Sequence, residues 1–152
     1  MWKRESRVDK ARDLFREGYN CCQAVVAAFS DLYNMDEETA LKLSCSFGGG
    51  MGRMKEVCGA VCGMAMIVGM ETGNIDPKNI EAKQENYEMV RYVMNEFKKE
   101  NGSIVCRELI GLDGIDEGAR IQDRIDGGYY AKKPCIEFIA DAVKILEKQF
   151  YS

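Results

Sequence analysis

Cysteines are the residues of this sequence whose type and number most strongly indicate chemistry. There are seven: Cys21, Cys22, Cys45, Cys58, Cys62, Cys106 and Cys135. An odd number argues against a framework in which every cysteine is paired in a disulfide. The sequence contains no histidine, which excludes imidazole nucleophile pairs, histidine general bases and histidine metal ligands. Thiols are therefore the expected redox or metal-binding groups, because thiolates attack disulfides and bind metals.

Four of the cysteines are expected at or near the starts of separate helices: Cys21, Cys58, Cys106 and Cys135. Asn20 is the predicted cap before the first of them, Ser103 lies three residues before the third, and Pro134 directly precedes the fourth. The N–H groups of a first helical turn have no partner within the helix, and the helix dipole places partial positive charge there. Both effects favour thiolate over thiol.

The elements that position these cysteines are expected to be helices, since apolar residues recur at helical spacing and no alternating strand is visible. Helices are predicted over 6–17, from the cap Asn20, from the cap Asp36 to the glycine run at 48–50, and over about 55–70. Further helices are predicted from 76–77 to 101–102, from Ser103, and from Pro134. Residues 111–133 are assigned to a loop or to a short helix around 117–124. The predicted fold class is an all-α, single-domain bundle of about six or seven helices over residues 1–152.

Several details of these helices are predicted from caps and apolar spacing. Ser6 is assigned as the cap of the first helix, and Gln23 completes a capping box with Asn20. The long fifth helix is expected to face inward with Ile80, Tyr87, Val90, Met94 and Phe97. The last helix is expected to do so with Ile136, Ile139, Ala140, Val143 and Leu146.

Charge and hydropathy limit the partners and the compartment. The net charge is −4, from 21 basic and 25 acidic residues, which disfavours nucleic acid as a partner. The most apolar stretch, residues 58–70, is too short to span a bilayer, and no secretory signal is recognised at the N-terminus. We therefore expect a cytoplasmic protein with reduced thiols.

The glycine-rich segment 47–53 lacks the Gly-Lys-Ser/Thr of a phosphate-binding loop. It is interpreted as a tight turn that brings backbone close to a cysteine centre. Gly59 and Gly63 allow close helix approach, and Gly59 is also a candidate for leaving room for a cofactor beside Cys58. Cys45 and Cys62 are expected to be core-packing residues.

The order of these motifs resembles the family of redox-active proteins named for its pattern C_GCAxxG_C_C. The resemblance is carried by Gly18–Val25, Phe47–Arg53, Cys58–Gly63, Cys106–Gly111 and Pro134–Cys135. It implies that the signature cysteines are Cys21, Cys58, Cys106 and Cys135, with Cys22 a neighbour of the site. The chain is also similar to the cluster-bearing part of split-Soret cytochromes, which implies an iron–sulfur cluster. It has no Cys-x-x-Cys-His motif, so haem attachment does not follow.

Several functions remain open on the sequence. The leading expectation is electron transfer at an iron–sulfur cluster held by the four signature cysteines. The alternatives are a metal-free thiol–disulfide cycle, a structural zinc site with the same four ligands, and a helical interaction protein with inert thiols. Whether the chain is an enzyme, which redox protein it meets and whether it forms a homo-oligomer are not determined by the sequence.

Overall fold

A computed structural model describes residues 5–111 and 134–151 of the chain. Its described part contains seven α-helices: α1 (Val8–Arg16), α2 (Cys21–Phe29), α3 (Glu37–Ser44), α4 (Gly59–Thr72), α5 (Ile80–Asn101), α6 (Cys106–Ile110) and α8 (Cys135–Phe150). Two 3₁₀ turns, Ser30–Tyr33 and Cys45–Phe47, follow α2 and α3. No β-strand occurs in these residues beyond one isolated bridge between Val57 and Val105. The all-α prediction is confirmed. The predicted element at 111–133 lies outside the described residues, except for Gly111.

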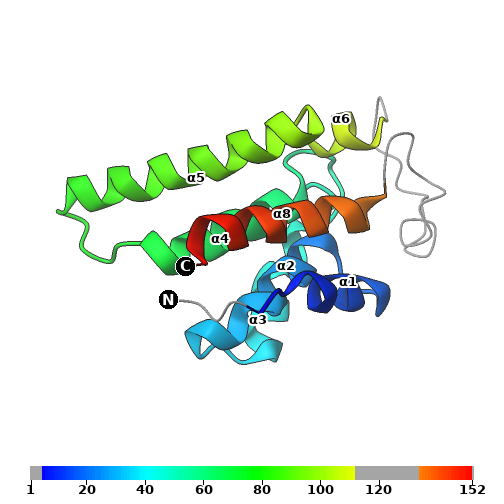
Figure 1. Ribbon diagram of the computed structural model, residues 1–152, viewed down its shortest axis with the longest axis horizontal. Coiled ribbons are helices and arrows are strands. Elements are labelled where there is room, and N and C mark those ends of the chain that lie inside the picture. Colours follow the sequence, from blue (N-terminus) through cyan, green and yellow to red (C-terminus); the bar gives the residue numbers. More distant parts are fainter. Residues whose placement is uncertain (1–4, 112–133, 152) are drawn as a thin grey trace.

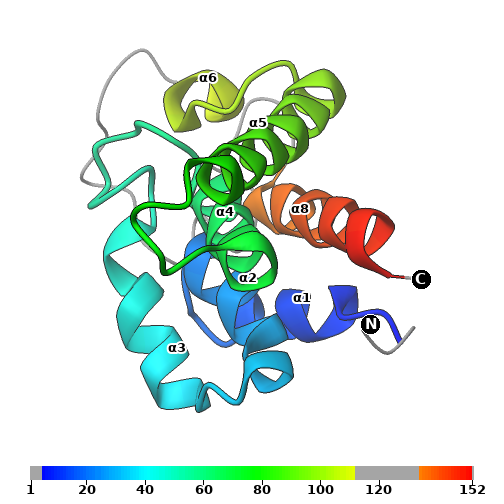
Figure 2. The ribbon, with the colours of Figure 1, turned by 90° about the vertical axis from the view of Figure 1, so that its left-hand side faces the viewer.

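Helix α4 lies at the centre of the bundle and contacts α2, α5 and α8 (Figures 1 and 2). All residues of α2 except Gln23 are buried, so this helix is apolar around nearly its whole circumference. Close approach of α2 and α4 depends on Gly63, where a Cβ would lie 2.9 Å from the Cβ of Val25 and 3.2 Å from the carbonyl oxygen of Cys22. The predicted helix-packing role of Gly63 is confirmed.

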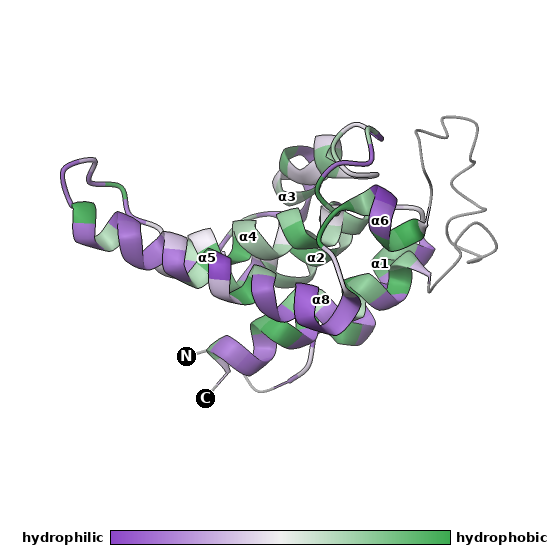
Figure 3. Ribbon diagram, turned by 90° about the horizontal axis from the view of Figure 1, so that it is seen from above, coloured by the Kyte–Doolittle hydropathy of each residue, from purple (hydrophilic) through white to green (hydrophobic). Residues whose placement is uncertain are grey.

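Helix α5 is the longest helix, and its first half extends beyond the rest of the bundle (Figures 1 and 3). The predicted inward face was wrong there: Ile80 is 65% exposed and Tyr87 is 52% exposed. The buried residues are Val93 and Phe97, and the Phe97 ring lies 6.1 Å from the ring of Phe138 in α8. The start of α5 extends past its neighbouring helices, so periodicity there does not correspond to burial.

The predicted inward face of α8 is confirmed for Ile139, Ala140, Val143 and Leu146, all of which are buried. Ile136, predicted with them, is only partly buried.

Four predicted helix starts also need correction. The fourth helix begins at Gly59 rather than 55, because residues 55–57 run alongside the segment before α6. The fifth begins at Ile80 with Asn79 as its cap, after a turn that contains Pro77. Arg7, not Ser6, is the N-cap residue of α1. The cap of α6 is Val105, whose N–H is accepted by the Ser103 hydroxyl at 3.0 Å.

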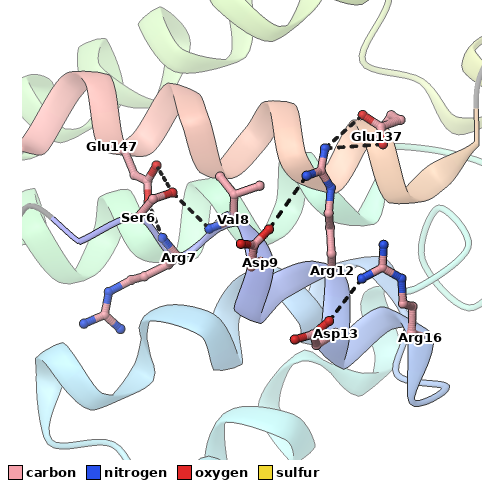
Figure 4. A network of polar contacts seen from close by, with 9 residues as sticks. All are labelled: Ser6, Arg7, Val8, Asp9, Arg12, Asp13, Arg16, Glu137 and Glu147. Carbon is pink, nitrogen blue, oxygen red and sulfur yellow. Dashed lines mark hydrogen bonds and ion pairs between the residues drawn. The ribbon is translucent and has the colours of Figure 1, made fainter.

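A polar network fastens α1 to α8 (Figure 4). Arg12 in α1 pairs with Glu137 in the first turn of α8, at 3.2 Å. Near the other end of α8, Glu147 accepts hydrogen bonds from the Ser6 hydroxyl at 3.0 Å and from the Arg7 backbone N–H at 2.6 Å. Both ends of α8 are therefore held, including the end at which Cys135 lies.

Within the described ranges, no helix is both long and apolar enough to cross a membrane.

Candidate redox centre

The first cysteine of the centre, Cys21, opens α2. The Asn20 side chain accepts a hydrogen bond from the Gln23 N–H at 2.9 Å, and the Gln23 side chain accepts one from the Asn20 N–H at 2.9 Å. This reciprocal capping box, predicted from the sequence, is confirmed. It fixes the first turn of the helix, in which Cys21 and Cys22 are both buried.

Cys58 and Cys106 are brought together by a short antiparallel contact between two extended segments. The Cys58 N–H donates to the Ile104 carbonyl at 2.8 Å, and the Cys106 N–H donates to the Glu56 carbonyl at 2.5 Å. Cys58 is the N-cap residue of α4 and Cys106 is the first residue of α6. The predicted helix-start positions of both cysteines thus become adjacent, although they are far apart in the sequence.

Arg107 holds the segment before Cys58 in place. Its Nε donates to the Lys55 carbonyl at 3.1 Å, and its Nη2 donates to the Met54 carbonyl and to Glu56, each at 3.0 Å. Nothing in the sequence beyond the position of Arg107 directly after Cys106 indicated this clamp. Lys55, which is 1% exposed, was also not predicted to be buried, because a lysine is ordinarily a surface residue.

The glycine-rich segment passes directly over Cys106, as its interpretation as a tight turn implies. Gly50 has φ +75°, and a Cβ there would lie 2.8 Å from the Cβ of Cys106 and 2.6 Å from the Glu56 nitrogen. Only glycine combines this backbone conformation with such a close approach.

Cys135 is the first residue of α8 and follows Pro134, its N-cap residue. The cysteine is 5% exposed. In Figure 1 the start of α8 lies on the same side of the bundle as the starts of α2, α4 and α6.

The electrostatics of Cys58 indicate which thiols lie in its neighbourhood. Burial raises the pKa of the Cys58 thiol well above its usual value. Three neighbouring thiols raise this pKa further: Cys21, Cys135 and Cys106. Charge–charge interactions weaken with distance, so these three thiols lie in the neighbourhood of Cys58. The expectation that a helix start favours thiolate is wrong for Cys58, because it caps α4 from a buried position.

Because Gly59 has no side chain, the Cys21 thiol can lie directly against it. A Cβ at Gly59 would lie 2.4 Å from the Cys21 sulfur, 3.0 Å from the Phe47 carbonyl oxygen and 3.2 Å from the Cys22 nitrogen. The space beside Gly59 that the sequence suggested for a cofactor is therefore filled by Cys21. Its structural effect is to let Cys21 approach the start of α4.

The remaining cysteines differ from one another. Cys22 is fully buried. Burial is the main cause that raises the pKa of its thiol, and the neighbouring Cys21 and Cys62 raise it further. Cys62 is partly buried, and burial together with Cys21 raises its pKa to about 11. Cys45 is exposed, so its predicted role in core packing is wrong. The cause is that α3 ends at Ser44 and Cys45 begins a 3₁₀ turn at the surface.

All seven cysteines lie in the described part of the chain, and none of them forms a disulfide. Among the described residues, no three cysteine or carboxylate side chains are arranged as they would be around a single bound metal ion. What the arrangement offers chemically is four sulfur donors in a largely water-excluded site.

Comparison with known proteins agrees with the cysteine pattern. Neither a comparison with curated proteins nor one with solved structures finds a match. A family model described as "Putative redox-active protein (C_GCAxxG_C_C)" matches residues 19–149, which include all seven cysteines. Because the match covers most of the chain, the protein belongs to the C_GCAxxG_C_C family of redox-active proteins.

Proposed function

We propose that the protein transfers electrons at an iron–sulfur cluster ligated by Cys21, Cys58, Cys106 and Cys135. The observation that carries the proposal is that the starts of α2, α4 and α6 lie together. Gly59 lies directly against the Cys21 sulfur, and backbone hydrogen bonds join the segments that carry Cys58 and Cys106. Cys135, at the start of α8, lies in the neighbourhood of Cys58 as well. Four cysteine thiolates are the usual ligand set of such clusters, and a bound cluster supplies one-electron chemistry.

Three features suit these residues to a cluster: their donor atoms are thiols, the thiols are buried, and glycine backbone lies against two of the cysteines. All four thiols are at most 6% exposed, which would shield a cluster from water. Gly59 and Gly50 have no side chains where Cys21 and Cys106 lie, so these two cysteines can lie close to the backbone of the neighbouring segments. The first turns of α2 and α8 supply N–H groups near anionic sulfur, which is favourable electrostatically.

The residues around the thiols have positioning roles in this proposal. Asn20 fixes the turn that carries Cys21. Arg107 fixes the segment that leads into Cys58. Neither residue is proposed to ligate or to transfer an electron.

The test is anaerobic purification followed by an absorption spectrum and analysis of iron, zinc and acid-labile sulfide. Visible absorption with iron and sulfide is expected for the unmodified protein. Cys58→Ser and Cys106→Ser are expected to lose both, whereas Cys62→Ala and Cys45→Ala, the matched controls, are expected to retain them.

Two results would overturn the cluster proposal in favour of a named alternative, and a third would overturn its ligand set. Zinc without colour would indicate a structural four-cysteine site. Metal-free protein that loses two titratable thiols on oxidation would indicate a thiol–disulfide cycle. Loss of iron in Cys62→Ala but not in Cys106→Ser would mean that the ligand set is wrong.

A further inference from the structure

A cavity of about 510 Å³ opens beside the start of α2. Its described lining combines the aromatic side chains of Phe15 and Tyr19 with backbone of the glycine-rich segment and with Arg53. The volume falls within the range of small-molecule sites, which are mostly apolar with a few polar groups. No part of the proposed electron transfer uses this cavity.

The wall nearest α2 is held rigidly by hydrogen bonds. The Asn20 side-chain nitrogen donates to the Cys45 carbonyl at 2.8 Å, while its oxygen is used in the capping box. The Gln23 side-chain nitrogen donates to the Leu41 carbonyl at 2.9 Å. Both carboxamides are therefore engaged, and the wall that they form is preorganised.

Arg53 supplies the charge of the cavity. Among the described residues its guanidinium makes no ion pair and no hydrogen bond, and it is only partly exposed. Its stem is placed by Gly49, where a Cβ would lie 2.8 Å from the Arg53 Cγ. An arginine held in this way presents a planar fork that matches a carboxylate.

We propose that the cavity binds a small organic anion, with a carboxylate paired to Arg53 and an apolar or aromatic body against Phe15 and Tyr19. The shape, the aromatic lining and the uncompensated cation each point to this class of ligand. The proposal concerns binding alone and does not depend on which metal, if any, occupies the cysteine centre.

The cavity lies next to the cysteine centre. Asn20 in its wall is bonded to Cys21, and Gly48 in its wall is bonded to Phe47, whose carbonyl oxygen approaches Gly59. The lining of the cavity is therefore adjacent in sequence to Cys21 and to Phe47, both of which lie against Gly59.

Cys45 provides a reporter for the test, because it lines the cavity and is the exposed one among the seven cysteines. Its thiolate attacks an aromatic disulfide, forms a mixed disulfide and releases one aryl thiolate, which is measured by absorbance. The rate constant is compared for dithiobis(nitrobenzoate), which carries carboxylates, and for uncharged dithiodipyridine. Cys45→Ser identifies the phase that belongs to this residue.

Arg53→Gln is expected to slow the reaction with the anionic disulfide about threefold or more, in line with loss of a partly exposed ion pair. The rate constant for the uncharged disulfide is expected to stay unchanged. Arg53→Lys should restore part of the difference. Arg91→Gln, which removes a charge from the exposed side of α5, should alter neither rate. Equal effects of Arg53→Gln on both reagents, or no effect on the anionic one, would overturn the proposal.

A second measurement uses a ligand that does not react. Benzoate is expected to protect Cys45 saturably from iodoacetamide in the unmodified protein, and to protect it less in Arg53→Gln. Absence of protection at high benzoate concentration would also overturn the proposal. Iron content plays no part in either readout, so failure of the cavity proposal and failure of the cluster proposal are distinguishable.

Discussion

Replacing Gly59 by alanine tests whether close approach of Cys21 to the start of α4 shapes the cysteine centre. The added Cβ would lie 2.4 Å from the Cys21 sulfur and 3.0 Å from the Phe47 carbonyl oxygen. The cysteine side chain has only one rotatable bond and the oxygen belongs to backbone, so relief requires α2 or the glycine-rich segment to move. Overpacking of this kind costs about 1–3 kcal/mol. At about 2–4 °C per kcal/mol for a chain of this size, we expect the midpoint of thermal unfolding to fall by several degrees.

The same helix offers two matched controls. At Gly69 a Cβ would meet nothing within 4 Å, so Gly69→Ala should raise stability by up to about 1 kcal/mol through helix propensity. At Gly63 a Cβ would meet Val25 and the Cys22 carbonyl oxygen but not the Cys21 sulfur. Gly63→Ala should therefore destabilise the helix pair and affect the cysteine centre less.

The readouts are thermal unfolding by circular dichroism and, for each variant, the iron content after anaerobic purification. Gly59→Ala should lower both, and Gly63→Ala mainly the first. If Gly59→Ala were as stable as Gly69→Ala, the close contact between Gly59 and Cys21 would not exist in solution, and the reasoning about this site would be refuted.

The other predictions concern groups that position the cysteines or fasten the helices. Arg107→Met should lower the free energy of unfolding by about 1–2 kcal/mol in urea, because it removes three partly exposed hydrogen bonds, whereas Arg16→Met should cost under about 0.5 kcal/mol; equal costs would contradict the clamp. Asn20→Ala should cost about 1 kcal/mol by loss of the cap, and thermal unfolding that matches the unmodified protein would argue against the capping box. Hydrogen bonding to Arg7 lowers the pKa of Asp31, so this carboxylate stabilises the fold above the ordinary aspartate pKa, and the gain is lost as pH falls through its lowered value. Asp31→Asn should therefore be less stable than the unmodified protein at neutral pH, by under about 1 kcal/mol because Asp31 is half exposed, and the difference should vanish in strong acid; a difference independent of pH would contradict this origin.

The sequence predicted the helix starts correctly where the interactions that form them join residues only a few positions apart. The capping box of Asn20 and Gln23 and the cap Asp36 are formed by residues three positions apart, so the sequence contains both partners. The apolar face of α8 was predicted for a similar reason, since α8 is covered along its length. Ile80 and Tyr87 show the limit, because burial in α5 depends on where neighbouring helices end.

The cysteine site was less accessible to prediction, because its geometry depends on contacts between distant segments. The start of α4 was predicted at 55, within a segment that instead forms hydrogen bonds with residues 104–107. This pairing converts Cys58 from a residue of the first turn into the N-cap residue. No periodicity within either segment indicates it, since each contributes only two or three residues to the contact.

The glycines explain why the pattern is nonetheless recognisable in the sequence. Gly50 lies against Cys106 and Gly59 lies against Cys21, so each of these glycines gives close access to a cysteine on a different helix. A side chain at Gly59 would separate the starts of α2 and α4, and one at Gly50 would push the glycine-rich segment away from the start of α6. The spacing of cysteine and glycine along the chain therefore reflects one geometric requirement: a backbone segment must approach the cysteine at the start of α2 or of α6 more closely than side chains on both partners would permit.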